Sequence, residues 1–122
     1  MVMGTISQSL VASAARTTSS NSDQVTGILG CTGAVILINV SASSGSTPTL
    51  DFTIQTYDPA GAAWVDLVAV PQITGAGRVT KIIYPNASGA LYQVLPFPYR
   101  VKWVIGGSTP SFTFSIGVNY LP

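Results

Sequence analysis

The tetrapeptide Gly-Ser-Thr-Pro occurs twice in the chain, at residues 45–48 and 107–110, and the same alternating pattern follows each copy. The apolar residues of this pattern are Leu50, Phe52 and Ile54 after the first copy, and Phe112, Phe114 and Ile116 after the second. Alternation with a period of two is typical of a β-strand with one buried face. The repeat therefore predicts two similar β-hairpins with the same turn chemistry, each sending an inward stripe into a common core.

The distance between the two copies argues against a repeat architecture. They begin at Gly45 and Gly107, and two copies so far apart are too few for a solenoid, which stacks about three or more short units. We predict instead that they form two equivalent corners of one sandwich.

Further β-rich runs are separated by segments rich in Gly, Pro and Ser. These runs span residues 35–40, 64–70, 79–84, 90–95 and 99–105. No capped segment of useful length shows a helical period. Short strands at regular spacing predict an all-β fold: an antiparallel β-sandwich, jelly-roll-like, of about eight strands.

The chain divides into two parts by composition. Residues 1–16 are small and polar with scattered apolar positions, which predicts an N-terminal arm or edge strand. Residues 17–122 form a single β-sandwich domain in this prediction, since about a hundred residues suffice for one core. The expected anchors of the arm on a neighbouring subunit are Val2, Ile6, Leu10 and Val11.

Charged residues make up only 7% of the chain, against about 25% in an ordinary soluble domain. Two interpretations are open: a β-domain covered by Ser and Thr hydroxyls, or a surface partly covered by other subunits, because interface cores are depleted in charge. The interpretation that other subunits cover part of the surface is favoured.

The net charge of +1 argues against a nucleic-acid partner. The longest apolar run, residues 34–38, is too short to span a bilayer, and the start of the chain lacks the pattern of a signal peptide.

The inventory of reactive side chains is short. The chain has no His and no Glu, and Cys31 is its single cysteine. A Ser-His-Asp or Cys-His arrangement is therefore impossible, and no zinc-type ligand set exists. We expect no enzymatic activity, no cofactor and no metal site. Asp51 is expected on an outward strand face, where it could form a surface ion pair with Arg100 or Lys102.

Two further features are candidates for contact with a partner. Residues 35–40 are apolar on both pleat faces, so that the arm or a neighbouring subunit is expected to cover one face, with Ile36 and Ile38 as contact residues. Arg100 and Lys102 share the polar face of their strand and form either a solvated face or the rim of an interface. The aromatic residues, among them Trp64 and Trp103, could line a sugar-binding platform, although core positions are favoured for most of them.

Two segments carry a resemblance to a known group of proteins. Residues 44–55 read SGSTPTLDFTIQ, and residues 58–67 read DPAGAAWVDL. They resemble small structural proteins of tailed bacteriophages, in which a strand of the form SPTLDVTIQ leads through a Gly-rich turn to W-x-D-L. Residues 12–17, 99–101 and 110–115 are similar to the same group.

The resemblance implies a role without catalytic residues. Members of the group with an assigned role resemble capsid decoration (cement) proteins or other virion parts. It implies a virion protein on the capsid surface, assembled in the host cytoplasm, that binds the major capsid protein, with a homotrimer as the favoured state. The alternatives are a tail or head–tail connector component, and a carbohydrate-binding β-sandwich module.

Overall fold

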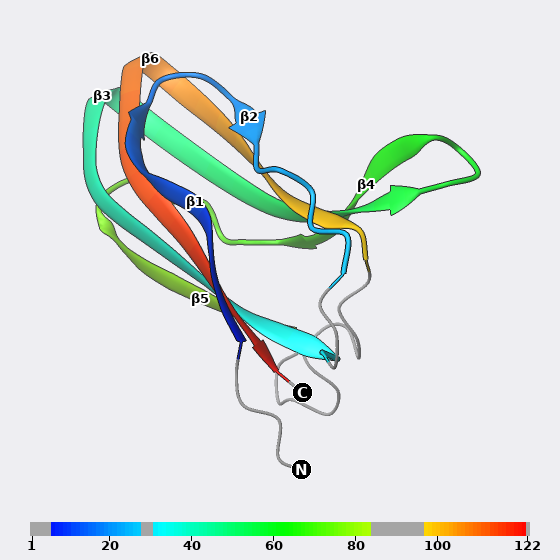
Figure 1. Ribbon diagram of the computed structural model, residues 1–122. Coiled ribbons are helices and arrows are strands. Elements are labelled where there is room, and N and C mark those ends of the chain that lie inside the picture. The colour runs from blue at the N-terminus through cyan, green and yellow to red at the C-terminus, as the bar shows by residue number, and fades with distance from the viewer. Residues whose placement is uncertain (1–5, 28–30, 84–96, 122) are drawn as a thin grey trace.

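The computed structural model describes residues 6–27, 31–83 and 97–121, and these residues form an all-β, antiparallel structure without a helical segment. In this part of the chain, no helix is long and apolar enough to cross a membrane. The strands are β1 (Ile6–Arg16), β2 (Ser20–Asn21), β3 (Gly33–Asp58), β4 (Ala63–Ala69), β5 (Gly77–Ile83) and β6 (Tyr99–Leu121) (Figure 1).

Two long strands form the centre of the sheet. β3 has 26 residues and β6 has 23, and they pair antiparallel from Gly33↔Leu121 to Thr56↔Tyr99. β1 and β2 pair with the other edge of β6, while β4 and β5 pair with the other edge of β3. The described strands thus belong to one six-stranded sheet that does not close on itself. The prediction of an all-β antiparallel fold is confirmed. The predicted strand at residues 90–95 lies outside the described residues.

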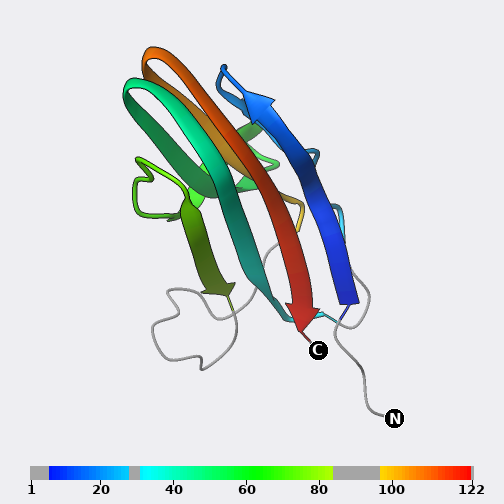
Figure 2. The ribbon, with the colours of Figure 1, turned by 90° about the vertical axis from the view of Figure 1, so that its left-hand side faces the viewer.

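Both central strands bend sharply at one place (Figures 1 and 2). The two Gly-Ser-Thr-Pro segments meet there, with Ser46 paired to Ser108, and the pairing register shifts on both sides of this pair. The chain continues through each copy in the middle of a strand. The prediction of two hairpin turns is therefore wrong. Instead of two corners, the copies build one shared corner.

The bend follows from the backbone angles of the repeat. Gly45 and Gly107 both have φ of 111°, and Thr47 and Thr109 both have φ of 46°. These positive angles give each strand an irregular, bulged course, and bulges bend a strand and leave residues unpaired. The register has no partner for Pro48 or Pro110, so a residue without an N–H is tolerated there.

The core lies between the two halves of the bent sheet. Phe52 and Phe114 meet edge to face with ring centroids 5.0 Å apart, and Trp103 meets Phe114 at 5.2 Å. The predicted inward stripes are confirmed, since their six members are buried: Leu50, Phe52, Ile54, Phe112, Phe114 and Ile116. Five further residues of β6 are buried with them: Tyr99, Val101, Trp103, Val118 and Tyr120.

The N-terminal segment lines the free edge of β6. β1 pairs with the second half of that strand, from Ile6↔Tyr120 to Arg16↔Phe112 (Figure 2). The Arg16 guanidinium donates to the Phe114 carbonyl at 2.8 Å and lies 4.5 Å from the Phe114 ring centroid. Such a cation–π contact adds to the hydrogen bond, so Arg16 fixes the end of β1 on the core.

The polar segment at residues 17–23 lies along the first half of β6. The Ser22 N–H donates to the Val101 carbonyl at 2.8 Å, and the Ser22 hydroxyl accepts from the Val101 N–H at 2.9 Å. The Ser19 hydroxyl accepts from the Ile105 N–H at 2.9 Å. Hydroxyl side chains thus occupy edge groups of β6 that would otherwise be open to another strand.

A buried pair of tyrosines joins the two ends of β6. The Tyr99 hydroxyl donates to the Tyr120 hydroxyl at 2.5 Å, and Tyr120 donates to the Gln8 side-chain oxygen at 2.5 Å. Burial raises the pKa of Tyr99 well above its usual range, and the hydrogen bond to Tyr120 raises it further. Burial also raises the pKa of Tyr120. Both phenols are therefore neutral hydrogen-bond donors over the physiological pH range.

Candidate functional site

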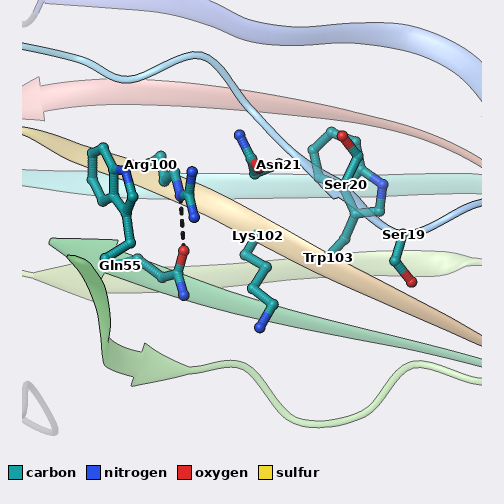
Figure 3. Close-up of a pocket in the computed structure, with 8 residues that line it drawn as sticks. Ser19, Ser20, Asn21, Gln55, Arg100, Lys102 and Trp103 are labelled. Carbon is teal, nitrogen blue, oxygen red and sulfur yellow. Dashed lines mark hydrogen bonds between the residues drawn. The ribbon is translucent and has the colours of Figure 1, made fainter. Parts of the chain in front are cut away.

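An open groove lies on the outer face of the sheet, over the first half of β6 (Figure 3). Its volume is about 440 Å³. Side chains of β2, β3, β4 and β6 and of the segment before β2 line it: Ser19, Ser20, Asn21, Gln55, Trp64, Arg100, Lys102 and Trp103. The groove therefore depends on segments that are far apart in the sequence.

Arg100 is held in place on two sides. Its Nε donates to the Gln55 side-chain oxygen at 2.8 Å, shown as a dashed line in Figure 3. Its guanidinium carbon lies 4.5 Å from the centroid of the Trp64 ring. Gln55 is only 4% exposed and donates to an Asp66 carboxylate oxygen at 2.9 Å. The guanidinium plane is thus fixed by buried contacts, and its terminal nitrogens have no acceptor among the described residues.

Alternation along β3 puts Gln55 on the outward face together with Asp51, yet the Gln55 side chain is buried. The pleat direction is as predicted, because Gln55 contacts Arg100 and Asp66 on the outer face. The β4 strand and the Arg100 side chain cover that part of the face and remove the amide from solvent.

Lys102 lies two residues further along β6, with Thr53 opposite it on β3. Within residues 6–27, 31–83 and 97–121, its ammonium group forms no hydrogen bond or ion pair. The eight residues that line the groove include two cations and no carboxylate. The groove therefore carries two cations on a chain with few charges, and the nearby Asp66 carboxylate is bound by Gln55.

The expected ion pair between Asp51 and Arg100 or Lys102 is not found among the described residues. The β3–β6 register places Asp51 opposite Val104. The Asp51 carboxylate accepts hydrogen bonds from the Gln72 amide at 3.1 and 3.2 Å instead. This arrangement leaves both cations of the groove available to an external anion.

Four of the described aromatic residues, Tyr99, Trp103, Tyr120 and Trp64, do not form an open platform. Trp103 is 5% exposed, and Tyr99 and Tyr120 are fully buried, which confirms their predicted core positions. Arg100 covers the ring of Trp64. Stacking of a sugar ring needs an exposed aromatic face, and in the described residues these four rings supply none of useful size.

The strand predicted to be apolar on both faces has one face in the core. Ile36 and Ile38 are 0% and 1% exposed, so these two predicted contact residues are inaccessible to a partner. The opposite face carries Val35 and Leu37, and Val35 pairs with Ile82 of β5. β1 lies along β6 and not over this face, so the expected cover by the arm is not seen in the described strands.

We call Val35, Leu37 and Ile82 the apolar outer face. Leu37 is 37% exposed and Ile82 is 44% exposed, and Gly117 lies opposite Leu37 on β6. The glycine has no side chain that could cover the leucine. This leaves apolar side chains exposed on the half of the sheet that does not carry the groove.

The predicted arm residues occupy different environments. Ile6 is 41% exposed, Leu10 is half-buried and Val11 belongs to the core. Val2 lies outside the described residues. The structure therefore does not bring the predicted contact residues together: Arg100 and Lys102 line the groove, while Ile6 lies at the start of β1.

Reactive groups are sparse in the described residues. Residues 6–27, 31–83 and 97–121 contain no cluster of three or more His, Cys, Asp or Glu side chains that could hold a metal ion. The Cys31 thiol donates to the Gly33 carbonyl at 3.1 Å, and burial raises its pKa. A raised pKa keeps the thiol protonated, which is typical of a structural cysteine.

Sequence reasoning missed Gln55, Trp64 and the Ser19–Asn21 segment as parts of one site. Alternation along β6 was a usable signal, because it placed Arg100 and Lys102 on one face.

A comparison of the chain with protein-family models, with curated proteins and with solved structures gives no match.

Proposed function

We propose that this chain is a non-enzymatic structural protein of a tailed-phage virion, and specifically a capsid decoration (cement) protein that binds and stabilises the major capsid shell. The apolar outer face is the observation that carries the proposal, since Leu37 and Ile82 lie exposed on a regular sheet surface. The similarity of residues 44–55 and 58–67 to phage structural proteins supports it. In this proposal the bent sheet serves as a jelly-roll-like sandwich body.

The mechanism is mechanical. Burial of apolar surface contributes roughly 25 cal/mol per Å², and a protein that binds only the assembled shell stabilises it by mass action. A contact surface with few charges avoids desolvation of unpaired ions. Neighbouring copies at a threefold position would form a homotrimer, in which each copy bridges adjacent capsid subunits.

A sugar-binding function is less well supported than assembly. Trp103 is buried in the core, and Arg100 packs on a face of the Trp64 ring, so a pyranose ring would have to displace Arg100 to stack on that face. A tail or head–tail connector role would use the same apolar outer face, and the number of copies per particle separates it from a decoration role.

Placing a carboxylate on the apolar outer face should weaken particle binding. We expect Leu37→Asp and Ile82→Asp each to weaken binding to stripped capsids by about 10-fold or more, because each buries an unpaired charge on docking. Both positions are exposed in the isolated chain, so the melting temperature should change little. Co-sedimentation of the variants with capsids measures the effect.

Val65→Asp is the matched control. Val65 is 42% exposed on β4, away from the apolar outer face, and its substitution should leave capsid binding unchanged. Binding of Leu37→Asp and Ile82→Asp at the wild-type level would refute the assignment of this face as the contact surface.

A further inference from the structure

We propose that the groove over β6 binds an extended acidic segment of a partner protein, with carboxylates on alternate residues that meet Arg100 and Lys102. The inference rests on the proposed function in one respect, namely that the ligand belongs to a protein. Its chemistry comes from the groove itself, which offers two cations, several hydroxyl and amide groups, and no carboxylate.

The Arg100 guanidinium group is already oriented for a carboxylate in the free chain. Its Nε is occupied by Gln55 and its plane is packed on Trp64. What remains is the pair of terminal nitrogens, and an arginine can offer two parallel N–H groups to one carboxylate. The buried amide of Gln55 is itself hydrogen-bonded to Asp66, and this contact holds the amide in the orientation that binds Arg100. Little side-chain entropy is therefore lost when a ligand binds.

The spacing of the two cations selects an extended ligand. Arg100 and Lys102 project from the same face of one strand at positions two residues apart. This separation is about 6.8 Å along the strand. A peptide in extended conformation repeats its side chains on one face at the same distance, so Glu-x-Glu or Asp-x-Asp matches the two cations at once.

Polar groups at one wall of the groove suit a peptide backbone. Asn21 donates its amide nitrogen to the Ser22 carbonyl at 2.8 Å, so its side-chain oxygen is directed by a fixed contact and can accept an N–H. Ser20, which pairs with Trp103 in the β2–β6 register, adds a hydroxyl to the lining of the groove (Figure 3). A volume of about 440 Å³ holds a few residues of an extended chain, within the common range of ligand sites.

Other anions fit less well. A nucleic-acid backbone is bound by many cations along a track, and this groove offers two. An acidic sugar would gain from ring stacking, which the covered face of Trp64 does not provide. The observations therefore favour a peptide, and an acidic oligosaccharide is the competing outcome of the test.

The test is a titration of the purified chain with the hexapeptide Glu-Ser-Glu-Ser-Glu-Ser, followed by ¹⁵N NMR. We expect saturable shifts of the Trp64 indole N–H, the Arg100 Nε–H and the Asn21 amide, weakening as salt rises. Arg100→Gln and Lys102→Gln should each weaken binding by about 5-fold or more. Arg100→Lys keeps the charge and loses the paired N–H groups. Its affinity for the peptide should lie between those of the wild type and Arg100→Gln.

Two matched controls locate the effect in the groove. Arg78→Gln and Lys81→Gln remove the same charges from β5, on the other half of the sheet, and should bind the peptide as the wild type does. The peptide Gln-Ser-Gln-Ser-Gln-Ser should cause no shifts.

Three results would overturn the inference: no saturable shifts with the acidic peptide, equal weakening by Lys81→Gln and Lys102→Gln, or binding of an oligogalacturonate in the groove without binding of the peptide. Because this titration uses the isolated chain, its failure leaves the capsid-binding result untouched. Peptide binding by a chain that does not bind capsids would refute the decoration role and leave the peptide-binding property of the groove standing.

Discussion

Substitution of Gly45 or Gly107 by alanine is expected to destabilise the fold by at least about 3 kcal/mol, and the double variant is expected not to fold. Each glycine has φ of 111°, a conformation that is strained for any residue with a side chain. A Cβ at Gly45 would lie 2.8 Å from the Thr109 carbonyl oxygen, and one at Gly107 would lie 2.8 Å from the Thr47 carbonyl oxygen. Urea unfolding of the purified variants measures the loss.

The cause is the close contact between the two copies of the repeat. Each glycine allows the backbone of the other copy to approach, so the backbone cannot move away from one Cβ without disturbing the opposite strand. Gly27→Ala is the matched control, because a Cβ there meets nothing within 4 Å. We expect a change within about 0.5 kcal/mol for the control. Wild-type stability of Gly45→Ala would show that the corner is not packed as described.

The second large effect concerns alkaline pH. The pKa values of Tyr99 and Tyr120 are raised in the folded chain by burial, whereas a phenol in the unfolded chain ionises near pH 10. Stability is therefore fully present below about pH 10 and falls above it, because only the unfolded chain releases the protons. The expected loss is about 1.4 kcal/mol per pH unit for each buried phenol.

Urea unfolding between about pH 9 and 11.5 tests this expectation. Tyr99→Phe should lower stability by about 1 kcal/mol at neutral pH, since one hydrogen bond is lost, and should flatten the alkaline decline. Tyr57 is an exposed tyrosine of β3 that pairs with Trp64 of β4. Tyr57→Phe should show the same decline in stability with pH as the wild type. An equal decline in wild type and Tyr99→Phe would contradict the role of the buried pair.

The strands were predictable because their alternation is local. Leu50, Phe52 and Ile54 show a period of two in the sequence, and all three are buried. The corner was not predictable in the same way. A short segment that contains Gly, Ser and Pro is a common turn signal, and Gly-Ser-Thr-Pro becomes a bend only because the other copy lies opposite. That pairing, Ser46↔Ser108, joins positions far apart in the chain.

The surface residues show the same limit. The run at residues 35–40 is apolar on both faces, so no period in it could tell that Ile36 is in the core while Leu37 is outside. Arg100 and Lys102 were correctly assigned to one strand face. Their surroundings come from Gln55, Trp64 and the segment at residues 19–21, and no local pattern connects these parts of the sequence.

The low content of charged residues is reflected in one particular strand face. A strand face with Val35, Leu37 and Ile82, facing solvent in the isolated chain, is a surface that gains free energy when it is covered. The positively charged groove lies on the other half of the same sheet. A partner that contacts both regions would be held by apolar burial at one and selected by charge at the other.

We propose that this chain coats a phage capsid as a structural component. Quantitative mass spectrometry of purified phage particles measures its copy number. We expect hundreds of copies of this chain per particle, in a fixed ratio to the major capsid protein. Particles that lack the chain, or that hold only a handful of copies, would contradict it.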